Sequence, residues 1–434
     1  MGTLVMIGQV ILALSILIIL HELGHFLAAR AFGIKVEKFY LFFDAWGVKL
    51  FKFNYKGCEY GIGWLPLGGY VKIAGMIDES MDTAQMKEEP KPWEFRSKPA
   101  WQRLIVMLGG IIVNVIVGIL VFWMLIFKYG DSDYDNTRLY GIKPGIIGEK
   151  IGLQEGDKIL AVNGKPANLF IQDVMSSEVL MGDAQLRIER QGKVMDIALP
   201  ATMLNDVAEY KRNEFVSPIF KMLPVDSVFE GTRAQKMGLK KGDQIVAVNG
   251  VKVERLDYFQ EEIAKNRGKQ ITLDVLRGSD SLQLVAEADT SSKLGFTNLP
   301  MVMRKYTLGE SLPLGTAKAF AVVTDNIKGF GKIFKGEVRA DKALSGPVGI
   351  AKLFGSEVDW TRFWNLVGML SMALAFMNLL PIPALDGGHV LFLLVEMIQG
   401  KPLSDKFLET AQMIGFFILI ALMLFTFGND ILKW

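Results

Sequence analysis

The chain has 434 residues, half of them hydrophobic and 22% charged, with a formal net charge of +2. This length is too great for one small domain and allows about two to four. The near-neutral charge gives no indication of nucleic-acid binding. A lone cysteine, Cys58, excludes an intramolecular disulfide and a cysteine-based metal cluster. An apolar composition with so many charges indicates membrane segments joined to at least one soluble part.

Four apolar stretches are long enough, or nearly so, to be membrane helices. The first runs directly into HELGH and lacks both the charged start and the small-residue cleavage site of a signal peptide. We therefore predict a retained span instead of a cleaved leader. The predicted spans are residues 4–20 with a continuation to 29, 104–127, 363–380 and 411–427.

Basic residues gather on one side of these spans. They are Arg30, Lys35, Lys38, Lys98, Arg103, Lys401 and Lys406, whereas acidic residues follow the second span. Lys128 and Arg362 run against this bias. By the positive-inside rule, we predict that residues 31–102 face the cytoplasm, and that both termini and the large middle region face outside.

Residues 31–75 contain three runs rich in aromatic and β-branched residues, namely VEKFYLFF, VKLFKFNY and CEYGIGWL. Residues 44–47 and 56–57 are plausible turns between them. We predict a β-rich loop. It either dips into the membrane, where protein or water must cover its backbone, or forms a small soluble sheet.

The middle of the chain holds a repeat. GLQEGDKILAVNG (152–164) matches GLKKGDQIVAVNG (238–250), and each copy ends in an Asn-Gly turn. Each is followed by a further strand pattern, QLRIERQG and then ITLDVLRG. We predict two duplicated, mostly β domains, which resemble the PDZ domains of bacterial membrane proteases. They serve either as peptide-binding modules or as spacers and steric walls.

Residues 311–335 carry lysines among apolar residues. This pattern predicts an amphipathic helix, which either lies on a membrane surface or packs on the protein.

The motif HELGH places His21 and His25 four residues apart, so one helix face presents both imidazoles to one ion. Glu22 follows the first histidine and is close enough to act on a water at that ion. Such a motif arises often by chance, but ionisable groups inside a membrane span are by default functional and face a cavity.

Catalytic zinc takes three protein ligands and keeps one open position. Asp386 lies in an apolar region after Pro381 and Pro383, which should break the helix. A buried aspartate is costly unless it is paired or binds metal, so we predict Asp386 as the third ligand, the alternative being a helix cap. For His389 three roles are open: it orients Asp386, it contacts a substrate, or it only packs against its neighbours. Asn378 bonds another helix or holds a substrate, and the residues alone do not decide.

The motifs HELGH, PLGGYVK (66–72), LSGPVGI (344–350) and NLLPIPALDGGH (378–389) occur in this order around the two repeats. In this the chain resembles, over nearly its whole length, the site-2 protease family of intramembrane zinc metalloproteases. It is most similar to the bacterial regulator of sigma-E protease group with tandem PDZ domains. One departure is the second span, where the family often has Gly-Pro-x-x-Asn and this chain has Ile111 after Gly110, before Asn114. The bend of that span is therefore in doubt.

The resemblance implies a role for each motif residue. His21, His25 and Asp386 would bind Zn2+, and Glu22 would be the general base. Asn378 would hold the substrate backbone, and we place His389 in the same substrate site. The strands after the first span would form a membrane re-entrant hairpin, and the PDZ pair would exclude substrates with large external domains.

We predict a multi-pass α-helical membrane protein with about four spans, a membrane-associated β-hairpin or sheet region and two inserted, mostly β PDZ-like domains. The predicted parts are a first span (1–30), a β-rich loop (31–102), a second span (103–128), two PDZ domains (129–210 and 211–300), an amphipathic connection (301–359), a third span with LDGGH (360–398) and a fourth span (399–434).

The predicted function is hydrolysis of peptide bonds within the membrane segments of single-span substrates. The resemblance suggests pre-trimmed anti-sigma factors and remnant signal peptides as substrates, in a stress response at the bacterial inner membrane, with the active site towards the cytoplasm. An edge strand from residues 36–65 would pair with the unwound substrate. The rivals are a non-catalytic adaptor and an ion transporter; the complete set of site residues favours the enzyme.

Overall fold

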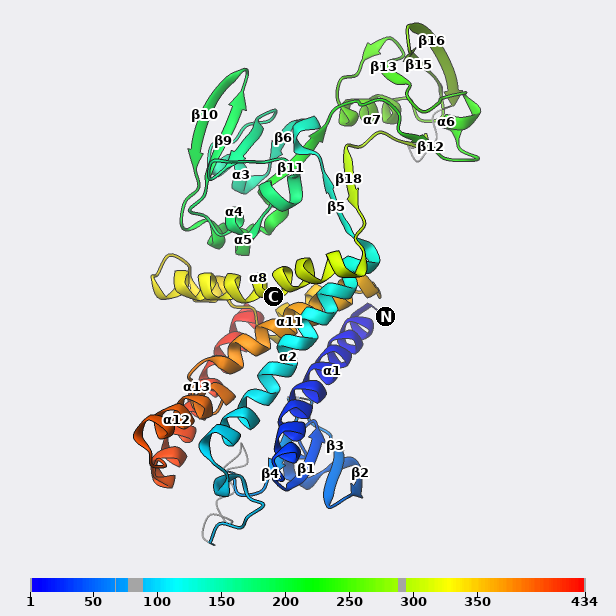
Figure 1. The fold of residues 1–434 in the computed structure, drawn as a ribbon. Coiled ribbons are helices and arrows are strands. Elements are labelled where there is room, and N and C mark those ends of the chain that lie inside the picture. Colours follow the sequence, from blue (N-terminus) through cyan, green and yellow to red (C-terminus); the bar gives the residue numbers. More distant parts are fainter. Residues whose placement is uncertain (1, 67, 77–88, 288–293, 433–434) are drawn as a thin grey trace. The chain divides into compact units, whose positions relative to one another are not determined.

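Figure 1 shows the computed structural model, which describes residues 2–66, 68–76, 89–287 and 294–432. The chain divides into two compact units. We call them the helical unit, which is Met1–Gly130, Lys305–Gly331 and Leu344–Trp434, and the β unit, which is Asp131–Arg304 and Lys332–Ala343.

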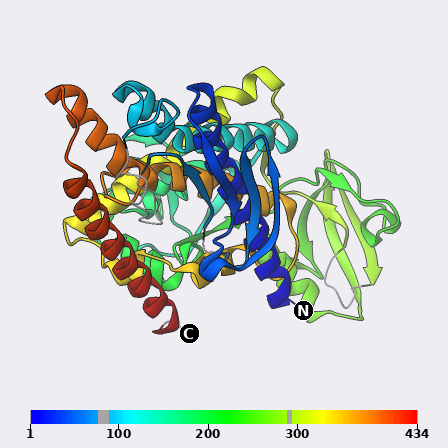
Figure 2. The same cartoon turned by 90° about the horizontal axis from the view of Figure 1, so that it is seen from below.

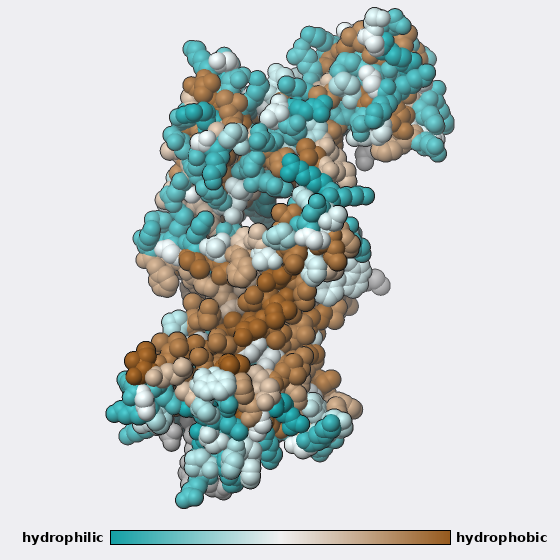
Figure 3. Space-filling view, viewed as in Figure 1, coloured by the Kyte–Doolittle hydropathy of each residue, from teal (hydrophilic) through white to brown (hydrophobic). Residues whose placement is uncertain are grey.

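Three helices in the described part of the chain are long and apolar enough to cross a membrane: α1 (Gly2–Ala31), α2 (Ala100–Tyr129) and α13 (Asp405–Leu432). They coincide with the first, second and fourth predicted spans. The third predicted span forms α11 (Trp360–Leu379), which is not among these three and carries Arg362, Asn365 and Asn378. A fourth crossing therefore stays a prediction. Figure 3 shows hydrophobic residues gathered over the helices of the helical unit.

Helix α2 packs against α1 and α11, and small residues bring the first pair close together. A Cβ placed on Gly24 would overlap the carbonyl group of Gly109, and one placed on Gly109 would lie 2.6 Å from the carbonyl oxygen of Gly24. Glycine at both positions lets the two backbones approach, as is common between membrane helices. The glycine within HELGH therefore has a packing role.

The chain breaks where the two prolines follow α11, as predicted. Pro381 disfavours helical conformation at the residue before it, and α11 ends at Leu379. The loop contains Ala384 at a φ of 79°, and α12 (Asp386–Gln399) begins directly after it. A Cβ on Gly388 would lie 2.5 Å from the carbonyl oxygen of Ile382, so the glycines of LDGG allow α12 to start against this loop.

The β-rich loop forms a four-stranded sheet of order β2-β3-β1-β4, and it lies against α1 (Figure 2). The three predicted runs are strands, and Lys56 and Gly57 form the tight turn between two of them, both with positive φ. The fourth strand was not predicted, although it lies in the PLGGYVK motif, of which residue 67 is outside the described residues. The strands are β1 (Val36–Leu41), β2 (Lys49–Tyr55), β3 (Cys58–Gly63) and β4 (Tyr70–Ile73).

The predicted amphipathic segment is α8 (Leu308–Phe334). Ala319 is buried in a cluster with Phe122 and Met372, and the indole of Trp123 donates a hydrogen bond to the carbonyl of Leu308 at 2.8 Å. One face of α8 therefore packs on protein. In the same helical unit, Asp430 of α13 accepts backbone hydrogen bonds from the start of α10 (Pro347–Phe354) and so joins these two helices.

The β unit repeats one four-stranded arrangement. The two sheets have the orders β10-β9-β7-β8 and β14-β13-β15-β16, with the strands of the repeated motif in equivalent positions. Both predicted Asn-Gly turns are present, since Asn163, Gly164, Asn249 and Gly250 all have positive φ. The strands are β7 (Lys158–Val162), β8 (Lys165–Pro166), β9 (Gln185–Arg190), β10 (Lys193–Ala198), β13 (Gln244–Val248), β14 (Val251–Lys252), β15 (Gln270–Arg277) and β16 (Asp280–Glu287).

The Gly-Asp of each repeat forms the same buried ion pair. Arg190 Nε and Nη2 lie 2.8 and 2.6 Å from the two carboxylate oxygens of Asp157, and Arg277 Nε and Nη2 lie 2.7 and 2.8 Å from those of Asp243. Each arginine also donates to a glycine carbonyl at 2.7 Å, and both aspartates are buried. Bidentate pairs of this kind fix one strand end to one turn.

Each repeat has its own hydrophobic core. The first core includes Phe215 and Val216, and β11 (Val216–Phe220) pairs with β6 (Leu139–Pro144), so this domain continues past residue 210. Two further strand pairs complete the β unit: β5 (Asp131–Tyr134) pairs with β18 (Met301–Arg304), and β12 (Ser227–Val228) pairs with β17 (Phe296–Thr297). Its α-helices are α3 (Ile146–Lys150), α4 (Ser177–Leu180), α5 (Met203–Tyr210), α6 (Arg233–Lys236), α7 (Leu256–Lys265) and α9 (Ala340–Ala343).

Candidate metal centre

Three side chains of the helical unit present their donor atoms to one point. His21 Nε2 and His25 Nε2 come from one face of α1 and lie 3.3 Å apart. Asp386 Oδ2, from the first residue of α12, lies 3.3 Å from each of them. The three atoms therefore form a nearly equilateral triangle. The alternative of a capping aspartate is wrong, because the N-cap of α12 is Leu385 and no side-chain capping bond is present.

This triangle fits a tetrahedral zinc ion. Donors at about 2.0–2.1 Å from zinc, spaced at tetrahedral angles, lie about 3.3–3.4 Å from one another. Asp386 Oδ2 is buried and makes no hydrogen bond of acceptable geometry within the described residues, although both imidazoles are close. A buried carboxylate oxygen without a hydrogen bond is costly, and a cation bound between it and the two imidazole nitrogens would remove that cost.

Outer contacts turn both imidazoles towards this point. His25 Nδ1 lies 2.8 Å from the carbonyl oxygen of Val106, which accepts only, so Nδ1 carries the proton and Nε2 keeps its lone pair. His21 Nδ1 lies 3.0 Å from the amide nitrogen of Asn114, whose amide oxygen, Oδ1, is buried and has no hydrogen-bond partner among the residues that the structure describes. Turning that amide over lets Oδ1 accept the Nδ1 proton and frees His21 Nε2 as well. The donor set thus has the tautomers that a metal requires.

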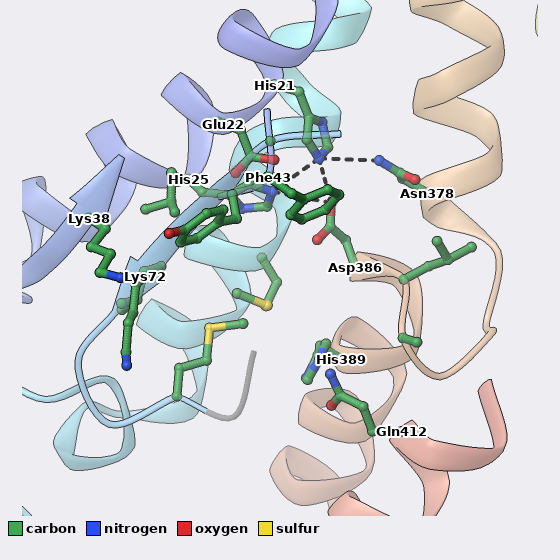
Figure 4. A pocket seen from close by; sticks show the side chains of 18 of the residues that line it. His21, Glu22, His25, Lys38, Phe43, Lys72, Asn378, Asp386, His389 and Gln412 are labelled. Atoms are coloured by element: carbon green, nitrogen blue, oxygen red, sulfur yellow. Dashed lines mark hydrogen bonds and ion pairs between the residues drawn. The ribbon is translucent and has the colours of Figure 1, made fainter. Parts of the chain in front are cut away.

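The centre opens into a pocket of about 600 Å³ within the helical unit. Figure 4 shows His21, Glu22, His25 and Asp386 together on one side of it. The sheet contributes one wall through residues 69–73, and the loop before Asp386 contributes another. The pocket is therefore enclosed by elements far apart in the sequence, with the donor triangle at its edge.

The pocket gathers the remaining predicted site residues. Glu22 lies on α1 beside β4, where a Cβ on Gly69 would be 3.7 Å from its Cγ. Asn378, at the end of α11, brings its amide nitrogen to 3.2 Å from His21 Nε2. His389 lines the pocket one turn after Asp386 and packs edge-on against Phe392. All six predicted residues are thus in one site.

Three further residues belong to this site and were not predicted from the sequence. A Cβ on Gly110 would lie 2.5 Å from both His21 Cε1 and His25 Nε2, so only glycine fits under the two rings. Asn114 was noted only for its place in a family motif, and Gln412 of α13 lines the pocket. For the two amides the available signal was a polar side chain inside an apolar span.

Comparison with known proteins gives consistent similarities over the full length. The chain is 29% identical to protease RseP of Yersinia pestis, over 99% of both chains. It is 29% identical to the regulator of sigma-E protease RseP of Salmonella typhimurium, over 97% of both. It is 28% identical, over 98% of both, to a protein of Xylella fastidiosa whose name places it among the zinc metalloproteases.

The apolar helices and the two-histidine, one-aspartate centre define a zinc metalloprotease with membrane features. The sequence profile of peptidase family M50 matches residues 9–422, and the chain belongs to this family. The predicted membership of the site-2 protease family, the predicted enzyme class and the predicted zinc dependence are thereby confirmed.

Proposed function

We propose that the protein hydrolyses peptide bonds within the membrane-spanning segments of single-span proteins. The observation that carries this proposal is the donor triangle, 3.3 Å on each side, with Glu22 beside it in a pocket of a largely apolar helical unit. A metal centre set among helices apolar enough to cross a membrane suits a substrate that is itself in the membrane. Candidate substrates are anti-sigma factors, in keeping with the names of the sigma-E relatives, and remnant signal peptides.

The chemistry divides between the ion and the chain. His21, His25 and Asp386 would hold zinc, which polarises the scissile carbonyl and lowers the pKa of the attacking water. Glu22 takes the proton of that water and returns it to the leaving amine. Asn378, on α11 beside His21, holds the substrate backbone. His389, one turn after Asp386, contacts the substrate elsewhere in the pocket.

A substrate helix must unwind first, because its peptide groups are bonded within the helix. The strand expected to receive the unwound segment is β4, which is an edge of the sheet and lines the pocket. The predicted range of 36–65 contains the other edge, β2, while β1 and β3 are internal; we favour β4 because the pocket contains no residue of β2 among those described. Addition of a strand at β4 would present extended backbone to the metal centre.

The β unit would act as a size filter made of two PDZ-like domains. Its support is the duplicated sheet order and the repeated ion pair, which define two similar modules inserted in the chain between α2 and α8. We further propose four spans in a bacterial inner membrane, with the site towards the cytoplasm, and the β unit and both termini outside. The clustered basic residues of the chain support that orientation.

The first test is cleavage of a single-span substrate in reconstituted membranes by the wild type and Glu22→Gln, with bound zinc measured in both. We expect cleavage to fall by at least about 10³-fold, consistent with losing the general base, while zinc stays bound. Cleavage that persists in Glu22→Gln would refute the assigned role. Absence of both zinc and cleavage in the wild type would favour the adaptor.

A further inference from the structure

We propose that Gln412 is a second substrate-holding residue, whose side-chain amide binds a peptide group of the unwound substrate across the pocket from β4. This inference rests on the proposed function. It concerns a residue on α13, which supplies none of the predicted ligands or catalytic groups.

Gln412 is buried where its neighbours are exposed. Its side chain is only 5% exposed, while Met413 and Ile414 are 44% and 55% exposed. It lines the metal-centre pocket together with His389, and in the view of Figure 4 both residues are drawn below Asp386, with Asn378 above it. The amide is therefore directed inwards, into the pocket that holds the metal centre.

The other described polar side chains in the apolar part of α13 have partners. Thr410 and Thr426 donate to carbonyls of their own helix, Asn429 donates to the carbonyl of Leu344, and Asp430 accepts from the start of α10. Gln412 alone makes no hydrogen bond among the described residues. Because the amide lines the pocket and is not used within the described residues, its donors and acceptor are free for a partner from outside the chain.

The chemistry of that partner follows from the amide itself. A glutamine side chain offers one carbonyl acceptor and two N–H donors, which match the N–H and C=O of a peptide group. An unwound substrate segment exposes such groups in an apolar setting, and carries no charge that would require Lys or Arg. A backbone peptide group is therefore the ligand that the amide suits best.

The position of Gln412 is fixed relative to the metal centre. Gly415 lies one turn further along the same face of α13, and a Cβ there would overlap the carbonyl group of Pro383. This close approach joins α13 to the loop that ends at Asp386. Gln412 thus lies one turn from a direct contact with the loop that carries Asp386, as substrate positioning near the metal centre requires.

The first experiment compares Gln412→Met, which keeps the shape and removes the amide, with Met413→Leu as a control on the same turn. We expect KM to rise about 5- to 30-fold, the loss of one or two hydrogen bonds, with kcat within about twofold and zinc content unchanged. The control should match the wild type. An unchanged KM, or a changed KM with lost zinc or a lowered Tm, would overturn the proposal.

A second experiment identifies the contacted atom. Synthetic substrates carry one ester in place of a peptide bond, moved residue by residue through the cleaved segment. We expect one ester to slow the wild type but to have little further effect on Gln412→Met. Additive effects at every position would mean that Gln412 holds only water, and would overturn the proposal. Wild-type cleavage with an inactive Glu22→Gln in the same preparations would leave the proposed function standing.

Discussion

At the scale of single residues, uncharged groups decide the geometry of the metal centre. The carbonyl of Val106 sets the tautomer of His25, Asn114 faces His21, and Gly110 leaves room for both rings. Ser371 donates to the carbonyl of Asn114 at 2.8 Å, which joins α11 to this arrangement. Contacts of this kind orient the metal ligands, and losing one commonly weakens metal binding.

Asn114→Leu should weaken zinc binding by about 10- to 100-fold, because His21 loses the partner that fixes its tautomer. Zinc affinity is measured in detergent by competition with a coloured chelator. Ile112→Val, at a half-exposed position two residues away, is the control and should bind as the wild type does. Equal affinities for the two variants would show that Asn114 does not orient His21.

Gly110→Ala should abolish tight zinc binding and cleavage together, since its Cβ would lie 2.5 Å from atoms of both histidines. The matched control is Gly8→Ala on α1, where a Cβ meets nothing within 4 Å. There the substitution should be neutral or slightly stabilising, as alanine is the better helix former. Bound zinc and activity are measured on both variants. A fully active Gly110→Ala protein would contradict the assigned packing.

At the scale of elements, the two edges of the four-stranded sheet differ in surroundings. Strand β4 lines the pocket, whereas β2 exposes Leu50, Phe51 and Phe53. These exposed apolar side chains favour contact with lipid for the β2 edge. Of the two edges, as far as the structure describes them, β4 alone lines the pocket, which is why we propose it as the strand that pairs with substrate.

A proline at Val71 of β4 should reduce cleavage at least tenfold, since it removes the backbone N–H that also contacts Glu22 and stiffens the strand proposed to pair with substrate. A proline at Leu50 of β2 is the matched control and should reduce cleavage less than twofold. Cleavage rates are compared at equal zinc content, which reports an intact centre. Similar rates for both variants would argue against strand addition at β4.

The ion pair of the second repeat makes that β-domain sensitive to acid. Arg277 holds the pKa of Asp243 below its usual value through a bidentate hydrogen bond. A carboxyl whose pKa is lowered on folding stabilises the folded state fully above its unfolded pKa of about 4. That stabilisation is lost as the pH falls from there through the lowered folded value.

Asp243→Asn should therefore destabilise the second β-domain by about 2 kcal/mol at neutral pH. Its stability should also no longer fall below about pH 4, because the carboxyl whose protonation weakens the wild type is absent. Amide hydrogen exchange of β13 and β15 in the full chain measures both effects. Asp226→Asn breaks an exposed pair with Lys241 and should change stability by less than about 0.5 kcal/mol. The same acid sensitivity in wild type and Asp243→Asn would contradict the assignment.

At the scale of the whole molecule, the larger part of the β unit, Asp131–Arg304, is an insertion whose ends meet. Strand β5 follows α2, β18 precedes α8, and Asp131 and Arg304 are direct partners in the ladder between them. The insertion can therefore be removed by joining Gly130 to Lys305 with a short flexible linker. Such a deletion tests the proposed filtering role separately from catalysis.

The variant lacking residues 131–304 should cleave substrates with intact external domains, which the full chain should cleave at least about tenfold more slowly than trimmed ones. Both proteins should cleave a trimmed substrate at similar rates if the helical unit keeps its zinc. Relative rates on intact and trimmed forms of one substrate measure the selectivity. An unchanged ratio would refute the size filter, and a protein without zinc calls for a longer linker before comparison.

The sequence by itself determined everything that depends on local spacing. His21 and His25 share a helix face because four residues make about one turn. The Asn-Gly turns, the proline break after α11 and the strands of the β-rich loop follow from backbone preferences of a few neighbouring residues. The duplicated motif also predicted two equivalent domains, since equal patterns fold alike.

Only the tertiary structure decided which distant groups meet. Asp386 reaches His21 because α2 packs between neighbouring helices through glycines, and no spacing rule predicts that rotation. The meeting of Asn114 with His21, the entry of Gln412 into the pocket and the choice of β4 as the edge beside Glu22 have the same cause. Each depends on helix facing and strand order, which are set by long-range packing.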